Sequence, residues 1–123
     1  MAFLNHDVLD DGLRVLTTYV NRVDICSQLP SNYGEATSDY SLGRYVGHSV
    51  GDPEPGDPNG RQVESAAVED GSVTDTGEAT HYALVDTNNT RLLAAGSLTN
   101  PQVVTDGNDF TLTPFTIRIP DAQ

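Results

Sequence analysis

Residues 80–120 read THYALVDTNNTRLLAAGSLTNPQVVTDGNDFTLTPFTIRIP, and this stretch decides the fold class. Apolar and β-branched runs alternate in it with clusters of Asn, Asp, Gly and Pro. Such runs are typical of β-strands, and such clusters are typical of tight turns. The stretch therefore predicts up to four antiparallel strands. It shows no pair of residues recognisable as a nucleophile with its base, so we expect it to be scaffold.

Pro114 marks a change of phase inside the last apolar run. Phe110 and Leu112 before it share one strand face, whereas Phe115 and Ile117 after it fall on the other. Side chains alternate between the two faces of a strand, so an unbroken strand would turn one of these sets toward solvent. An extra residue at the proline restores the phase, and we therefore predict a β-bulge at Pro114.

Residues 7–20 predict the single helix of the chain. Leu9, Leu13, Leu16 and Val20 recur at helical spacing and form one apolar stripe. The helix is short and contains a glycine, so it needs a tertiary contact for its apolar face in order to persist.

The middle of the chain predicts further short strands. Period-two alternation marks residues 23–29, 40–50 and 62–68. The polar residues 31–41 and 69–72 are expected to form a loop and a turn. All of these strands are short enough to belong to one antiparallel sheet system.

Residues 51–60, GDPEPGDPNG, are the strongest interruption of this pattern. Three prolines and three glycines rule out a regular ladder, which leaves a domain linker or a long exposed loop. Neither flank holds a complete core, so we expect a loop within one domain that spans residues 1–123. The predicted fold is mainly β: an antiparallel β-sandwich or small barrel with one N-terminal α-helix.

The charge of the chain is strongly acidic. It has 18 acidic residues against six basic ones, a net charge of −12, and every basic residue is an arginine. Such a chain repels nucleic acid and the anionic surface of a membrane, so neither is an expected partner. The acidity suits solubility, and it also suits docking onto a basic protein surface. The first residues lack a basic region followed by a long apolar run, so we expect no signal peptide or membrane span.

The sequence offers no recognisable catalytic or metal-binding motif. His6, His48 and His81 stand outside any metal-ligand spacing, and no Gly-x-Ser-x-Gly elbow or phosphate-binding loop occurs. The acidic side chains of residues 51–60 are an alternative calcium set, at a spacing that differs from that of an EF-hand. We therefore expect no enzyme activity, no catalytic residue, no cofactor and no bound metal.

Cys26 is the one cysteine, so it cannot form a disulfide within the chain. It falls on the strand face opposite to Val23 and Ile25. Two interpretations remain open. It is either a small buried hydrophobic residue or a subunit contact that forms a disulfide between chains.

Aromatic residues outside the core pattern are the candidate interface. The polar segment that follows the first predicted strand carries Tyr33, Tyr40 and Tyr45, and the N-terminus carries Phe3 and Leu4. Tyrosines in such a segment are half-buried strand residues, interface anchors or a platform for a sugar. With Cys26, these five residues are the predicted contact residues.

The order of these segments resembles a family. The helix LDDGLRVL (9–16) leads into RVDICSQLP (22–30), and GSVT (71–74), ATHYALVD (79–86) and RLLAAGSL (91–98) follow. This is similar to small structural proteins of tailed-bacteriophage virions, such as capsid decoration, head-fibre and tail-fibre-like proteins. The resemblance implies a non-catalytic virion component held by protein–protein contacts.

Within that family, a decoration (cement) protein on the outside of the capsid is the first expectation. Its partners would be the major capsid protein or other virion proteins. Docking at local threefold axes would favour a homo-oligomer, in particular a trimer. The alternative is a fibre, spike or neck-associated module that binds a host-surface glycan or another virion protein.

Overall fold

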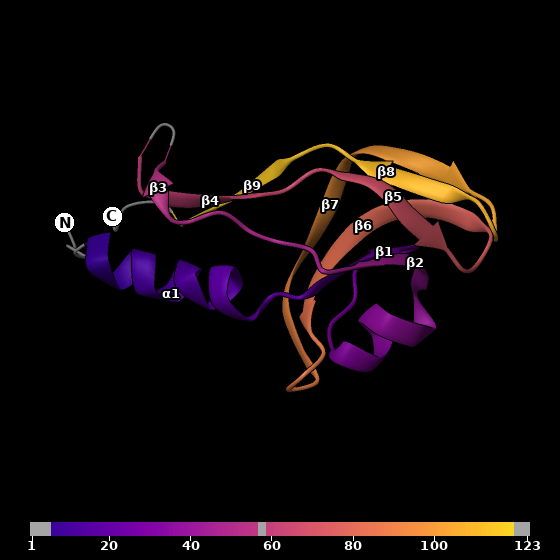
Figure 1. Ribbon diagram of the computed structural model, residues 1–123, viewed down its shortest axis with the longest axis horizontal. Helices are drawn as coiled ribbons and strands as arrows, with labels where there is room; N and C mark the ends of the chain where they lie inside the picture. Colours follow the sequence, from indigo (N-terminus) through magenta and orange to yellow (C-terminus); the bar gives the residue numbers. More distant parts are fainter. Residues whose placement is uncertain (1–5, 57–58, 120–123) are drawn as a thin grey trace.

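The computed structural model describes residues 6–56 and 59–119, with side chains from residue 12 onward (Figure 1). It contains one α-helix, one π-helical segment and nine strands within those residues. In chain order they are α1 (His6–Tyr19), β1 (Arg22–Cys26), η1 (Glu35–Asp39), β2 (Ser41–Val46), β3 (Glu54–Pro55), β4 (Arg61–Ser65), β5 (Val68–Val73), β6 (Gly77–Asp86), β7 (Arg91–Val104), β8 (Asp109–Leu112) and β9 (Phe115–Ile119).

The strands form two antiparallel sheets. The larger sheet has the order β7-β6-β1-β2-β5-β8 and is curled, and the smaller sheet has the order β3-β4-β9. Figure 1 shows α1 beside the small sheet at one end of the molecule, with the curled sheet at the other end. The predicted fold class is confirmed: the protein is mainly β, with antiparallel strands and one N-terminal helix, in the manner of a small sandwich or barrel.

One hydrophobic core joins the helix to both sheets. The apolar stripe of α1 is buried at Leu13 and Leu16, and it packs in the same cluster as Val63 of β4 and Leu84 of β6. Full burial of each such side chain contributes about 1.5–3 kcal/mol to stability. The short helix therefore gains from this core the tertiary contact that its sequence requires.

The sheet is covered on its other face as well. Cys26, Ala36, Ala83 and Val85 form a second buried cluster, in which Ala36 comes from η1. The predicted loop over residues 31–41 thus contains a helical segment that packs on the sheet. Because both faces are covered, four consecutive residues of β1, 23–26, are buried.

The prediction of a β-bulge at Pro114 is wrong, because the strands on either side of this proline belong to different sheets. β8 ends at Leu112 in the large sheet, where it pairs with β5, and β9 begins at Phe115 in the small sheet, where it pairs with β4. The change of phase marks the point at which the chain leaves one sheet for the other. Both apolar sets still face one core, as the phase argument required: Phe110 is buried and Ile117 packs against the same cluster.

Three further predictions need correction. Residues 69–72, expected to be a turn, lie inside β5, which is irregular between Val68 and Gly71. The 51–60 loop contains β3, which pairs with β4 in a hairpin. The Thr99-Asn-Pro turn lies within β7, which is one strand of 14 residues. In the first two cases a partner strand extends the sheet beyond what the local sequence predicts, and in the third the strand continues past the Pro-containing cluster as an irregular segment.

Candidate functional site

The two edges of the large sheet meet at a seam. β7 and β8 are at opposite ends of the strand order, and the curl of the sheet brings them together. Gln102 Nε2 of β7 donates a hydrogen bond to the carbonyl oxygen of Thr111 in β8 at 2.9 Å. Over the described residues, the backbone ladder of β7 is with β6 and that of β8 is with β5. The large sheet is thus curled far enough for a side chain of one edge strand to reach the other edge strand.

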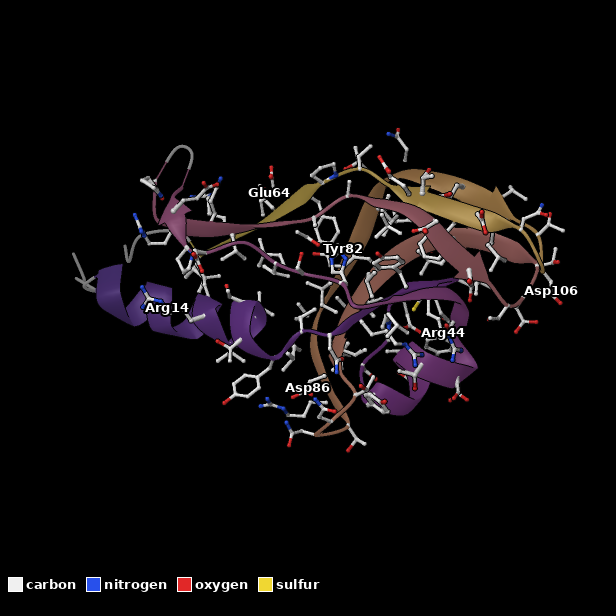
Figure 2. All side chains as sticks on the ribbon, in the orientation of Figure 1. Arg14, Arg44, Glu64, Tyr82, Asp86 and Asp106 are labelled. Atoms are coloured by element: carbon white, nitrogen blue, oxygen red, sulfur yellow. The ribbon has the colours of Figure 1, made fainter. Side chains whose placement is uncertain are left out.

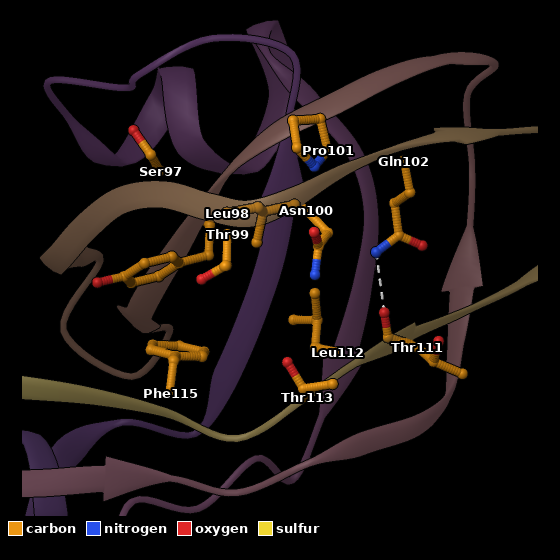
Figure 3. Close-up of a pocket in the computed structure, with 11 residues that line it drawn as sticks. Ser97, Leu98, Thr99, Asn100, Pro101, Gln102, Thr111, Leu112, Thr113 and Phe115 are labelled. Carbon is orange, nitrogen blue, oxygen red and sulfur yellow. Dashed lines mark hydrogen bonds between the residues drawn. The ribbon is translucent and has the colours of Figure 1, made fainter.

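A pocket of about 300 Å³ opens in this seam (Figure 3). Its walls come from residues 97–102 of β7 and from residues 111–113, which end β8. Phe115 and Tyr82 complete the lining. None of these eleven residues is charged, which sets the pocket apart in a chain of net charge −12.

A wide bulge in β7 forms one wall of the pocket. His81 pairs with Ser97 and Ala79 pairs with Gln102, so β7 advances five residues while β6 advances two. The intervening residues 98–101 leave the ladder. Pro101 has no N–H to donate, and β7 is an edge strand, which is where a proline and a bulge are tolerated.

Two aromatic rings lie in the pocket. The ring centroids of Tyr82 and Phe115 are 4.2 Å apart, with an interplanar angle of 38°. Tyr82 lies against the backbone of Gly96, where an added Cβ would come within 2.8 Å of the phenol oxygen. Burial raises the pKa of the Tyr82 phenol, so this group keeps its proton and can donate a hydrogen bond. Gly96 and Phe115 thus hold the Tyr82 ring in place.

Ser97 and His81 form a polar pair at the edge of the pocket. Ser97 Oγ lies 3.4 Å from His81 Nε2, and His81 Nδ1 lies 2.8 Å from Thr80 Oγ1. The sequence alone showed no nucleophile–base pair here, because the two residues meet only through the pairing of β6 with β7. A catalytic triad places a carboxylate where this chain has the neutral Thr80 hydroxyl, so the imidazolium that catalysis creates would lack its stabilising charge. We interpret His81 as a polar contact of Ser97, which lines the pocket.

The predicted tyrosines do not form one platform. Tyr33 and Tyr40 pack against the Cys26 cluster on the η1 side of the sheet. Tyr45 packs against the main core, on the opposite face. Tyr40 is also tied locally, because its hydroxyl donates to Glu35 Oε2 at 3.2 Å. Phe3 and Leu4 lie outside the described residues.

Cys26 lies inside the protein rather than on its surface. Its side chain is fully buried, and its thiol donates to the carbonyl oxygen of Ala36 at 3.6 Å. Burial, with a smaller effect from the charge of Asp24, raises the pKa of the thiol to about 12. Of its two interpretations, burial as a small hydrophobic residue fits this geometry, whereas a disulfide between chains would require η1 to move away.

We therefore expect Cys26 to be unreactive in the folded protein. At mildly alkaline pH the thiolate is scarce and enclosed, so Ellman's reagent should react slowly with native protein and completely in concentrated guanidinium chloride. Measuring absorbance with and without denaturant tests this. Full reaction within the mixing time under native conditions would contradict the buried placement.

His48 is a buried histidine at the junction of the two sheets. Its Nε2 hydrogen-bonds with Ser65 Oγ of β4, and its Nδ1 is buried with no hydrogen-bond partner among the residues that the structure describes. The nearest aromatic ring is that of Tyr45, which it meets edge-on at 6.5 Å. Burial lowers the pKa of His48 below its usual 6.5, because the imidazolium would lose its hydration.

Stability is expected to fall as the pH drops below 6.5 because of His48. Below that pH the unfolded chain binds a proton at this residue and the folded protein does not, so unfolding is favoured, by up to about 1.4 kcal/mol per pH unit. Urea unfolding of wild type and His48→Gln at several pH values measures the difference in slope. An unchanged slope in His48→Gln would refute the assignment.

Figure 2 shows Asp106 at the end of the curled sheet farthest from α1. Three exposed acidic residues, Asp75, Asp106 and Asp109, form what we call the acidic tip. They come from two turns that are hydrogen-bonded to each other: the Asp106 N–H donates to Thr76 Oγ1 at 3.0 Å. No arginine or lysine occurs in residues 62–90 or 92–117, so this acidic tip has no basic neighbour along the chain.

Two searches of the described residues bear on other kinds of site. Within residues 6–56 and 59–119, no three His, Cys, Asp or Glu side chains are grouped as a metal site would require. In that same part of the chain, no helix has the length and apolarity to cross a membrane.

The seam pocket is the site that sequence reasoning missed. Its two signals in the sequence were Pro101, in a cluster expected to form a turn, and the phase change at Pro114, which was expected to be a bulge in one strand. Pro101 lines the pocket, and so do Thr113 and Phe115, the two neighbours of Pro114 in the sequence. No protein-family model matches the chain, and neither the curated proteins nor the solved structures contain a match.

Proposed function

We propose that this chain is a non-catalytic structural protein of a tailed-bacteriophage virion. Its place would be the outer surface of the capsid, where it would dock on the major capsid protein as a decoration protein and stabilise the shell. The virion assignment rests on the resemblance of the segments described above. The observation that carries the docking role is the acidic tip.

The acidic tip supports docking through its charge and its geometry. Asp75, Asp106 and Asp109 project from turns that are fixed to each other, since Val73 N–H donates to the Asn108 carbonyl at 2.9 Å and Gly107 N–H donates to the Val73 carbonyl at 3.0 Å. Carboxylates on a rigid tip attract a basic surface without an ordering cost. Such an attraction mainly raises the association rate and weakens with salt.

Exposed apolar side chains offer a second kind of contact on other parts of the protein. Val103 in β7 is 78% exposed and Val46 at the end of β2 is 72% exposed. Leu29 is 56% exposed. Single exposed apolar residues are ordinary, but β-branched residues on a sheet surface are suited to burial against a partner. A trimer at a local threefold axis would bury such residues between copies, and we include that arrangement in the proposal.

The copy number in purified virions tests the proposal. Quantitative mass spectrometry should find hundreds of copies per particle, and cryo-EM should place the protein outside the shell. A handful of copies would support a fibre, spike or neck part instead. Absence from the particle would end the virion assignment.

The docking surface can be tested separately with charge variants. Heads stripped of the protein are incubated with the wild type, with Asp75→Lys/Asp106→Lys, or with the matched control Asp52→Lys/Glu54→Lys, and are then pelleted. The tip variant should bind markedly less than the control, although both carry the same net charge. Equal binding by the two variants would show that the tip is not the contact.

The alternative is a fibre or spike module that binds a host-surface glycan or another virion protein. The three tyrosines first considered for such a platform lie on two faces of the sheet, so they do not favour it. The uncharged seam pocket is the observation that does.

A further inference from the structure

We propose that the seam pocket binds a single neutral sugar residue. This inference goes beyond the decoration role and does not depend on it, because a virion protein at any position could present the pocket to a glycan. It is carried by three properties of the pocket: its aromatic rings, its uncharged polar groups and its size.

The aromatic rings give the pocket an apolar surface that is fixed in place. Tyr82 and Phe115 contact each other at 4.2 Å between centroids, and Gly96 leaves room for the Tyr82 ring to lie against the β7 backbone. The C–H face of a pyranose ring packs on such a surface, and the amphipathic Tyr82 adds a donor beside it. A rigid aromatic surface binds a flat apolar face at a low entropic cost.

The polar groups around these rings are those that recognise hydroxyls. Asn100 supplies an amide from the bulge, and Ser97 and Thr113 supply hydroxyls from the two walls. Figure 3 shows the Asn100 side chain extending from β7 toward the side of Leu112 and Thr113. An amide donates and accepts at once, so it can pair with neighbouring hydroxyls of a sugar. The position of Ser97 is supported by its contact with His81 at 3.4 Å.

The absence of charge in the lining selects among ligands. A phosphate, a sialic acid or another anion would find no arginine or lysine among the eleven lining residues, and it would approach a chain of net charge −12. A cation would find no lining carboxylate. A neutral polyhydroxylated ligand matches hydroxyls and amides without an unpaired charge.

The size of the pocket limits the ligand to about one sugar. Its volume of about 300 Å³ lies at the lower end of the range of small-molecule sites, roughly 300–1,000 Å³. A monosaccharide, or the terminal residue of a glycan, is the expected occupant.

An extended peptide added to the sheet edge is the competing occupant. Strand addition needs a regular exposed edge with successive N–H and C=O groups. The bulge at residues 98–101 interrupts that regularity in β7, and the Gln102–Thr111 hydrogen bond spans the opening. The geometry therefore favours the sugar.

Titration of ¹⁵N-labelled protein with methyl glycosides of glucose, galactose, mannose and N-acetylglucosamine tests the inference, with sialic acid as the anionic control. At least one neutral glycoside should shift the amide resonances of Ser97, Gln102 and Thr111 in a saturable way. Sialic acid should not shift them. If no neutral glycoside shifts these resonances, or if the shifts lie elsewhere on the protein, the inference is overturned.

Two variants then examine the contacts. Asn100→Ala removes an exposed amide and should weaken binding about tenfold, whereas the matched Asn88→Ala, on the β6–β7 turn, should bind as wild type. Phe115→Leu keeps an apolar side chain but removes the flat ring, and it should abolish saturable binding in protein whose circular dichroism shows it to be folded. Equal affinity in Asn100→Ala and Asn88→Ala would refute the assignment. A peptide from a displayed random library that shifts the same resonances, while every glycoside fails to, would establish strand addition instead.

Discussion

Replacing Gly71 with alanine is expected to lower the free energy of unfolding by about 3 kcal/mol. Gly71 lies in β5 directly opposite Phe110 of β8, and both residues are buried. An alanine Cβ would lie 2.7 Å from Phe110 Cδ1 and closer still to Cε1 and Cζ. The ring fills the space that the missing side chain leaves, so either the ring or the strand must shift.

Urea or thermal unfolding measures this loss, with Gly51→Ala as the matched control. The nearest atom to a Cβ at Gly51 is the Glu64 carbonyl oxygen at 3.5 Å, an ordinary contact, so this control should change stability little. A smaller side chain at position 110, opposite residue 71, should relieve the overlap between the alanine Cβ and the ring. Gly71→Ala/Phe110→Leu should therefore be less destabilised than the sum of its single changes. Strict additivity, or a stable Gly71→Ala, would contradict the packing described here.

Removal of the Asp24 carboxylate is expected to cost about 3 to 5 kcal/mol. Asp24 is fully buried in β1, and its two oxygens accept from Arg22 Nε at 2.6 Å and Nη2 at 2.8 Å. Ser41 Oγ of β2 donates to the same carboxylate at 2.8 Å. Asp24→Ala would leave the Arg22 guanidinium, which is only 13% exposed, without its counter-charge.

Chemical denaturation of three variants separates two quantities. One is the stability lost when Asp24 alone is removed from the Arg22–Asp24 ion pair, and the other is the net stability that the ion pair contributes. Glu64→Ala, at an exposed position, should stay within about 0.5 kcal/mol of wild type. Arg22→Met/Asp24→Leu removes both charges and should recover much of the stability that Asp24→Ala loses. If Asp24→Ala behaves like Glu64→Ala, the carboxylate is not the organising group of this part of the sheet.

The features that depend on neighbouring residues could be predicted from the sequence. The helical stripe of Leu13 and Leu16 and the alternation of strands in residues 80–120 are local patterns, and both were right. These patterns gave the fold class because each element carries its own periodicity.

The features that depend on distant partners could not be predicted in this way. The phase change at Pro114 was recognised, but only the identity of the partner strands, β5 before it and β4 after it, distinguishes a sheet crossing from a bulge. Segment 33–40 is polar and turn-like, and it becomes ordered because Ala36 packs over Cys26. The pocket needs a bulge in β7 and the closure of the sheet onto β8, neither of which any window of sequence contains.

The position of β1 in the strand order has a consequence for synthesis on the ribosome. β1 is made before β6, which is one of its two neighbours in the sheet, and residues 27–76 lie between the two strands. Until β6 emerges, one edge of β1 stays unpaired. Residues 23–26 of this strand are buried in the folded protein. Such an edge is a template for association with another chain. The nascent protein therefore passes through a period of exposure that ends only when β6 has been translated.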